Sequence, residues 1–298
     1  MPRKLSKAPP ATPATGVRVV TDSTASLPAV ARTGYGPFVV PLSVFTHDGP
    51  ALEGSQISTA RVGELLRKGE HFSTSQPSPE AFAVAYSVTP DIGAIVSIHL
   101  SGSLSGTYQA AVQAGKRTIV PVTVIDSRTT AMGLGFAALA AAECAAAQQT
   151  AEHVAARARE VAASAQVRFL VDSLSYLRSG GRISAGTATF GTALGVRPIL
   201  DIRDGRIELA ARVRSKSAAV DRLVALTVAD GKQMATPVYA AHYLDAPERG
   251  AKLAARLTAA GAKDVLISPL SAVLGAHVGP GAVATVVADW GEHHHPAA

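Results

Sequence analysis

Short segments rich in hydroxyl groups are the parts of this sequence best suited to chemistry. They place small polar side chains where β-strands are expected to end. The candidate residues are Asp22, Ser23, Thr74, Ser75, Ser103, Ser105, Gly106, Asp126 and Ser127, and a late glycine-rich segment adds His277. Open α/β sheets bind ligands at the ends of their strands. Hydroxyls and one imidazole suit an anionic or carbonyl head group that is held without necessarily being transformed, which favours binding over catalysis.

Several of these segments also have a purely structural interpretation. Asp22 with Ser23, and Asp126 with Ser127, are as well explained as helix caps. Thr74 precedes a separate cap at Ser78, so capping explains it less well. Arg182 follows two glycines, and a solvated side chain explains it as well as a binding role does. A routine core or turn residue is the alternative interpretation of His277.

A serine hydrolase is the main enzymatic alternative. It would use Ser105 or Ser103 as nucleophile with His277 and either Asp22 or Asp126. The Gly-x-Ser-x-Gly motif is absent from this turn, because Leu104 stands at its central position. No cofactor is predicted, since the sequence has no Gly-x-Gly-x-x-Gly motif. No metal site is predicted either, because the histidines are widely spaced.

The elements that must position these residues follow an α/β pattern. Strands are expected over 17–21, 38–44, 94–99 and 122–126, and helices over 59–69, 79–88, 104–118, 128–147 and 151–165. This alternation predicts a mainly parallel sheet with flanking helices.

The second half is expected to contain antiparallel pairing. Asp204-Gly205 separates two apolar runs and is a hairpin signal. Further strands are expected over 168–172, 197–202, 205–209, 238–241 and 265–268, and helices over 215–229, 246–260 and 281–290. The sequence therefore predicts two α/β domains, over 17–165 and 166–290, between a disordered tail at 1–16 and a second tail at 291–298.

Composition agrees with two soluble domains. The chain has 298 residues, 47% of them hydrophobic, which is enough for two cores. Its one cysteine, Cys144, gives no sign of an oxidising compartment, and no secretion signal is recognised, so a cytoplasmic location is expected. The apolar segment 131–147 is shorter than a membrane span and contains Glu143.

Positive charge is concentrated in one stretch. Residues 168–222 hold ten Lys or Arg against five Asp or Glu, within a net charge of +6. Such asymmetry indicates an anionic ligand or partner, or a solvated basic face. Nucleic acid is not the expected partner, because no recognised binding motif accompanies the charge.

Six ordered motifs together resemble the DegV family of fatty-acid-binding proteins. They begin at Thr21, Thr74, Ile98, Asp172, Arg197 and His277, and read TDSTASLP, TSQPSP, IHLSGSLSGTYQ, DSLSYLRSGGRI, RPIL and HVGPG. The chain departs from the usual family pattern at Ser26, at Ser101-Gly102 and at Ser175, and the second departure leaves both Ser103 and Ser105 as candidate ligand contacts.

The resemblance implies a non-enzymatic lipid carrier with two α/β domains. A long-chain fatty acid would lie between them, with its carboxylate near Thr74, Ser75, Ser103, Ser105, Gly106 and His277, and with Asp22, Ser23, Asp126 and Ser127 as possible support. The implied partner is an ATP-dependent fatty acid kinase related to dihydroxyacetone kinases. It would convert the carboxylate to an acyl phosphate for phospholipid synthesis, with Arg182 and His277 stabilising the charge during transfer.

Overall fold

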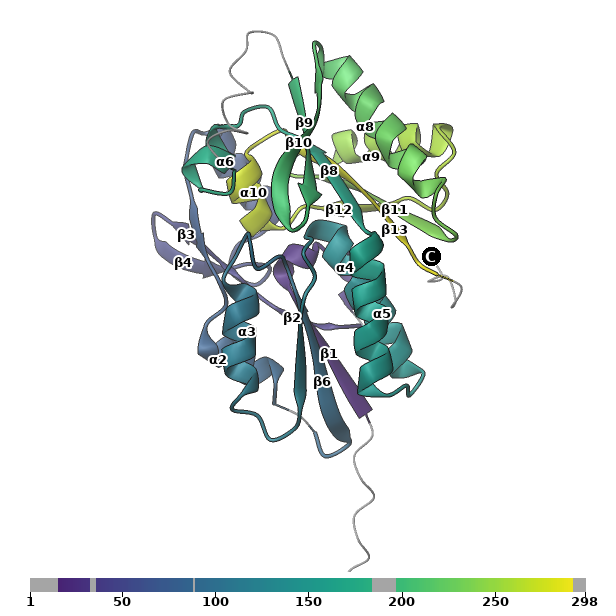
Figure 1. Cartoon of the computed structure of the whole chain (residues 1–298). Coiled ribbons are helices and arrows are strands. Elements are labelled where there is room, and N and C mark those ends of the chain that lie inside the picture. Colours follow the sequence, from purple (N-terminus) through teal and green to yellow (C-terminus); the bar gives the residue numbers. More distant parts are fainter. Residues whose placement is uncertain (1–15, 33–35, 88, 184–196, 292–298) are drawn as a thin grey trace, which may run out of the picture.

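A computed structural model describes residues 16–32, 36–87, 89–183 and 197–291, and the expected α/β class is confirmed (Figure 1). The described residues form three sheets with helices packed around and between them. Most of the two expected tails lies outside the described residues. Gly16, which was assigned to the N-terminal tail, instead begins the first strand.

The first sheet contains four parallel strands, as the alternating pattern predicted. They are β1 (Gly16–Asp22), β2 (Phe38–Val40), β6 (Ile92–His99) and β7 (Val122–Asp126), in the order β2-β1-β6-β7. The single strand expected over 38–44 is wrong. It ends at Val40, and after Pro41 the chain enters another sheet at Ser43. Proline has no N–H for a sheet ladder, which explains the break.

The second sheet is a small antiparallel one. It contains β3 (Ser43–Thr46), β4 (Gly49–Leu52) and β5 (Ser73–Ser75), in the order β4-β3-β5. Thr74 pairs with Val44 within this sheet, so it lies inside a strand and not in a turn after one. Buried Val44 packs with Val273 from near the C-terminus, which joins this small sheet to the second half of the chain.

The third sheet has six strands and is mixed, as predicted for the second half. Its strands are β8 (Gln166–Leu170), β9 (Arg197–Arg203), β10 (Arg206–Val213), β11 (Pro237–Tyr243), β12 (Leu266–Pro269) and β13 (Val283–Asp289), in the order β10-β9-β8-β13-β11-β12. Among these described strands, only β11 and β12 pair in parallel.

The predicted hairpin between β9 and β10 is confirmed. Asp204 and Gly205 have φ values of 49° and 77°. A tight two-residue hairpin turn needs positive φ at both central positions, which asparagine, aspartate and glycine adopt most easily.

The helix expected over 281–290 is wrong, because this segment is strand β13. It pairs with β8 on one side and β11 on the other, and six of its seven residues are buried. A strand covered on both faces is apolar throughout and lacks the alternation that identifies a half-exposed strand. Its Val and Thr side chains are β-branched and favour the strand.

The helices of the described residues mostly begin and end near their expected positions. They are α1 (Thr59–Arg67), α2 (Pro79–Ala85), α3 (Thr107–Gly115), α4 (Ala131–Ala146), α5 (Ala151–Ser164), α6 (Ser175–Ser179), α8 (Lys216–Gly231), α9 (Pro247–Ala259) and α10 (Ala272–Val278), with short 3-10 turns at Ser23–Ala25 and Ala29–Arg32. Ser78 caps α2 as expected, since its side chain accepts a hydrogen bond from the Ala81 N–H and Pro79 follows it. Helices α6 and α10 were not predicted from the sequence.

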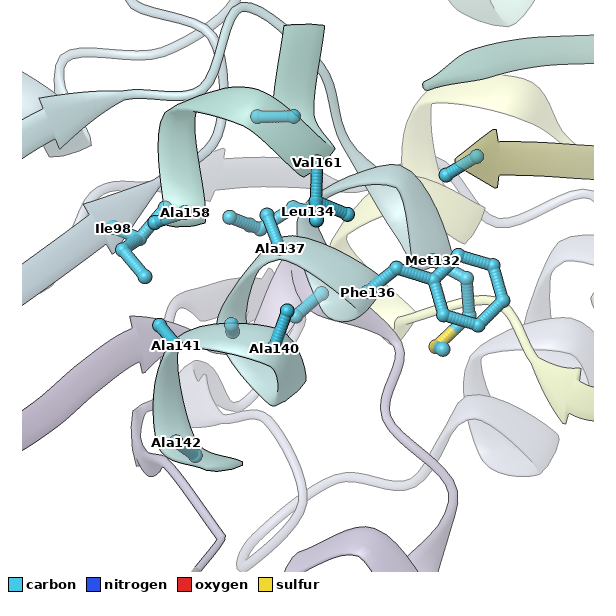
Figure 2. Close-up of a cluster of buried hydrophobic side chains, with 14 of the residues drawn as sticks. Ile98, Met132, Leu134, Phe136, Ala137, Ala140, Ala141, Ala142, Ala158 and Val161 are labelled. Atoms are coloured by element: carbon cyan, nitrogen blue, oxygen red, sulfur yellow. The ribbon is translucent and has the colours of Figure 1, made fainter. Parts of the chain in front are cut away.

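Helices α4 and α5 lie between the two larger sheets, where they form a shared core (Figures 1 and 2). Figure 2 shows the small side chains of α4, such as Ala137 and Ala141, near Ala158 and Val161 of α5. The same cluster includes Ile98 of β6 and Val286 of β13. The two sheets therefore share one core, and the division after residue 165 remains a proposal. Within the described ranges, no helix is both long and apolar enough to cross a bilayer.

Candidate ligand cavity

An apolar cavity of about 310 Å³ lies where all three sheets meet. This volume is at the lower end of the range for small-molecule sites. Its apolar walls come from strands, helices and loops of both halves of the chain: Leu42, Leu100, Leu104, Val167, Phe169, Leu177, Ile202, Ile207, Leu270, Val273, Leu274 and Val278. A ligand inside it would touch β8–β10 on one side and α10 on another.

The polar end of the cavity is built around Thr74 and His277. Thr74 lies in β5 and His277 lies near the end of α10, 203 residues later, yet Thr74 Oγ1 and His277 Nε2 are 2.8 Å apart. Gly180 allows the imidazole to sit there, because a Cβ at this glycine would come within 2.4 Å of His277 Nδ1. The glycine of the 180–182 turn is thus required by the close approach of the histidine.

His277 is uncharged at neutral pH. Burial, together with the positive charge of Arg182, lowers its pKa from 6.5 to about 4. Arg182 also lines the cavity, and its guanidinium is held by main-chain carbonyls. Its Nε donates to the Leu104 carbonyl at 3.2 Å, and its Nη1 donates to the Gly180 carbonyl. The polar end therefore combines a neutral hydrogen-bonding pair with one fixed positive charge, an arrangement suited to an anion.

The structure separates the two candidate serines of the 101–106 turn. Ser105 and Gly106 line the cavity, whereas Ser103 is exposed and is not among the lining residues. Ser105 Oγ is 2.9 Å from Thr107 Oγ1 and accepts a hydrogen bond from the Thr107 N–H, so it is tied to the start of α3. Ser75 also lines the cavity, next to Thr74.

Asp22 and Ser23 lie directly behind the lining. Asp22 accepts a hydrogen bond from the Leu100 N–H at 3.0 Å, and Ser23 accepts one from the Leu42 N–H at 3.0 Å. Both leucines line the cavity. Asp22 also caps the short turn after β1, as the structural interpretation proposed. These two residues hold the wall in place without facing the ligand space.

Asp126 and Ser127 likewise act on the backbone. Asp126 accepts hydrogen bonds from the N–H groups of Gly102 and Arg128, and thereby fixes one end of the serine turn. Ser127 Oγ accepts a hydrogen bond from the Thr129 N–H at 3.3 Å. Neither residue is part of the cavity lining.

The arrangement needed for the hydrolase alternative is not assembled. Asp22 is hydrogen-bonded to His99 at 3.0 Å, and Asp126 accepts hydrogen bonds from backbone N–H groups. Neither carboxylate is therefore paired with His277. The side-chain partner of His277 is Thr74, and Ser105 is bound to Thr107.

A buried chain of polar residues was not predicted from the sequence. His99 bridges Asp22 and Ser97 Oγ, which lies 2.7 Å away, and Tyr86 donates to Ser97 at 2.9 Å. Burial raises the pKa of Tyr86 to about 12, so its hydroxyl keeps its proton. Ser97, His99 and Asp22 are completely buried, which makes this chain part of the core and not a reactive centre. The alternation of Ser97 and His99 along one strand was the sequence signal for it.

Glu53 is a second unpredicted residue near the site. Its carboxylate accepts a hydrogen bond from the Ala272 N–H at the start of α10, the helix that carries His277. Burial raises the pKa of Glu53 from 4.5 to about 7. No sequence signal links residue 53 to residue 272. Across the part of the chain that the structure describes, no group of three or more His, Cys, Asp or Glu residues is placed to hold a metal ion.

Comparison with known sequences gives the same family over nearly the whole chain. A family profile described as "Uncharacterised protein, DegV family" matches residues 16–289. A DegV domain-containing protein of Streptomyces coelicolor is 46% identical over 275 residues, covering 91% of this chain and 98% of the relative. A DegV domain-containing protein of Deinococcus radiodurans is 34% identical and covers 90% of this chain and 96% of the relative.

Solved structures agree with the fold. A fatty-acid-binding DegV family protein from Thermus thermophilus superposes with a TM-score of 0.84 at 32% identity, covering 92% of this chain and 99% of that one. DegV from Bacillus subtilis, described as a fatty acid binding protein, gives 0.83 at 29% identity with the same coverage. The motifs around Thr74, Gly180 and His277 thus come together in space, and the chain that contains them belongs to the DegV family.

Proposed function

We propose that this protein binds a long-chain fatty acid in the cavity, with the carboxylate at the end formed by Thr74 and His277. The observation that carries the proposal is the division of the cavity into a long apolar wall and one polar end. The fatty-acid-binding descriptions of the Thermus thermophilus and Bacillus subtilis relatives support it.

The apolar wall would supply most of the affinity. Burying the roughly 14 methylenes of a sixteen-carbon chain, at about 0.8 kcal/mol each, gives roughly 11 kcal/mol before the costs of binding. The polar end then needs only to orient the head group. If His277 carries its proton on Nε2, it donates to Thr74 Oγ1, and the threonine O–H is free to donate to a carboxylate oxygen.

Mass spectrometry of the purified protein tests this proposal. Native spectra should show one fatty acid per chain, and denaturing spectra of the same sample should release it intact. Recovery of no lipid, together with no heat of binding when fatty acid is added to the protein, would refute the carrier function. A fatty acyl group attached covalently to serine would instead support hydrolysis.

We also propose that the bound carboxylate is presented to an ATP-dependent fatty acid kinase of the dihydroxyacetone-kinase type. A carboxylate oxygen would attack the γ-phosphorus of ATP, giving acyl phosphate and ADP. Arg182 and His277 lie at the polar end, where the product gains negative charge relative to the carboxylate. Because Arg182 is held by two backbone carbonyls, its charge is already positioned for this step.

Replacing Arg182 with alanine tests the kinase step separately from binding. Acyl phosphate formation with the cognate kinase and ATP should fall. Fatty acid affinity should change by about twofold or less, because the Arg182 guanidinium is already bound to main-chain carbonyls and the Thr74–His277 pair that holds the carboxylate remains. Arg222, an exposed arginine of α8, provides the matched control as Arg222→Ala. A full kinase rate in Arg182→Ala, or loss of lipid binding, would contradict the proposed role.

A further inference from the structure

A second cavity, of about 420 Å³, lies on the opposite face of the six-stranded sheet. Successive side chains of a strand point to opposite faces, and the two cavities follow this rule. Phe169 and Ala284 line the first cavity, whereas their neighbours Leu170 and Val283 line the second. Helices α8 and α9 cover this second face, away from α6 and α10 (Figure 1).

The second cavity has an apolar floor. Leu170 and Val283 of the sheet, Val220 of α8 and Leu253 of α9 form it. Leu170, Leu253 and Val283 are each 9% exposed or less, so the floor is continuous with the core beneath these helices. An apolar surface of this kind favours an aliphatic or aromatic group over a polar one.

The rim of the second cavity is strongly basic. Among the described lining residues, it contains Arg197, Lys216, Arg249, Lys252 and Arg256, with Asp172 as the single acidic residue. Asp172 is shared, because its carboxylate lies 2.9 Å from Lys216, 3.7 Å from Arg249 and 3.9 Å from Arg197.

The acidic residues do not balance this charge. Arg256 pairs with Asp221 at 2.8 Å. Five basic side chains therefore face two carboxylates, Asp172 and Asp221, which leaves three uncompensated positive charges. Among the described residues, Lys252 has no acidic partner within ion-pair distance.

We propose that this second cavity binds a single-chain amphiphile with an anionic head, whose aliphatic part rests on the floor while the head lies among the basic rim residues. An uncharged lipid would leave the rim unused, and a small inorganic anion would leave the floor exposed to water. A phosphate monoester suits the rim better than a carboxylate, because it carries more negative charge and more acceptor oxygens. The proposal does not depend on the ligand of the first cavity.

Calorimetric titration of protein loaded with one equivalent of palmitate tests the proposal, because the first cavity is then filled and the second is left free for the added ligand. Decyl phosphate should bind with one-to-one stoichiometry, at least tenfold tighter than decanoate and far tighter than inorganic phosphate or decanol. Raised salt should weaken binding of decyl phosphate. Equal binding of decyl phosphate and decanol, or no binding of either decyl anion, would overturn the proposal.

Two variants locate the binding. Ala255 of α9 is exposed and lines the cavity, so Ala255→Trp should block it, and decyl phosphate binding should weaken at least tenfold. Ala259→Trp places the same side chain one turn further along α9, outside the lining, and should have no effect. Lys252→Glu should weaken decyl phosphate more than decanoate.

These variants also separate the two sites. Palmitate loading of Ala255→Trp should remain normal, which would show that the protein is folded. If Ala255→Trp binds decyl phosphate as tightly as the parent protein, the anion lies elsewhere and the assignment is wrong. An acidic peptide that competes with decyl phosphate and binds more tightly would point to a protein partner and also contradict the proposal.

Discussion

Replacing Thr74 with valine should weaken fatty acid binding through the head group alone. Valine has nearly the same shape as threonine, and the backbone pairing of β5 with Val44 is unaffected. The change removes the hydroxyl that lies 2.8 Å from His277 Nε2 and faces the cavity. The apolar wall, which supplies most of the affinity, stays intact.

The size of this effect follows from the kind of bond that is lost. A hydrogen bond to a charged group contributes about 1.5–3 kcal/mol. Since each 1.4 kcal/mol is about tenfold in affinity, the dissociation constant for palmitate should rise between about tenfold and a hundredfold. The affinity for hexadecanol, which has the same chain without a carboxylate, should change much less.

Titration of delipidated protein with both ligands measures this difference, and Ser73→Ala in the same strand is the matched control, because Ser73 is exposed. The double variant Thr74→Val/His277→Ala should bind palmitate about as well as His277→Ala, if the imidazole acts through the threonine. An unchanged palmitate affinity, or an equal loss for palmitate and hexadecanol, would refute the assigned position of the carboxylate.

Three further variants test the groups around the site. Gly180→Ala should reduce palmitate affinity about as much as His277→Ala, because the added Cβ would displace the imidazole; normal affinity in a titration would show that the histidine position is not required. Burial lowers the pKa of His242 to about 4, and its Nε2 accepts a hydrogen bond from the Met132 N–H. The unfolded chain takes up this proton near pH 6.5 and the folded one only near pH 4, so this contribution to stability is complete above pH 6.5 and is lost as pH falls toward 4, by on the order of 3 kcal/mol. Urea unfolding at pH 7.5 and pH 5 should show a smaller drop in His242→Gln than in the parent protein, and equal drops would contradict the reasoning. Glu53 has the opposite effect on the pH dependence of stability, because its pKa is raised from 4.5 to about 7. The folded state holds this proton better than the unfolded chain does, so stability falls as pH rises from 4.5 through 7. Glu53→Gln should therefore unfold at higher urea concentration than the parent at pH 8 but not at pH 5, and a lower midpoint at pH 8 would count against a buried carboxylate.

The fold was predictable where a single local signal decides the structure. The parallel strands of the first half, the Ser78 cap and the Asp204-Gly205 turn each have such a signal, and the structure contains them. Strand β13 was mistaken for a helix because its neighbours bury both of its faces, and this leaves no alternation to read. The break at Pro41 was visible in the sequence, but the sheet that the next strand joins depends on distant contacts.

Some residues that line the candidate cavity were predictable from the sequence, but their geometry was not. Thr74, Ser105 and His277 were proposed from residue type and motif, and all three line one cavity. Packing between segments far apart in the sequence places Thr74 in a strand. It also places Asp22 behind the cavity wall, where its carboxylate binds the Leu100 N–H. The role of Glu53 at the start of α10 has the same origin, since 219 residues separate the carboxylate from the N–H that it binds.

The position of β13 constrains how the protein can be made. This strand ends at Asp289, yet it lies in the middle of the six-stranded sheet, between β8 and β11. Translation proceeds from the N-terminus, so β8 can pair with β9 well before it can pair with β13, which follows every other described strand in the sequence. Phe136 of α4 must also wait, because its ring packs edge-on against Trp290, with centroids 6.4 Å apart. The four parallel strands can pair early, but the cavity lacks a wall until Ala284 is in place. Any lipid in this cavity is therefore fully enclosed only once β13 has joined the sheet.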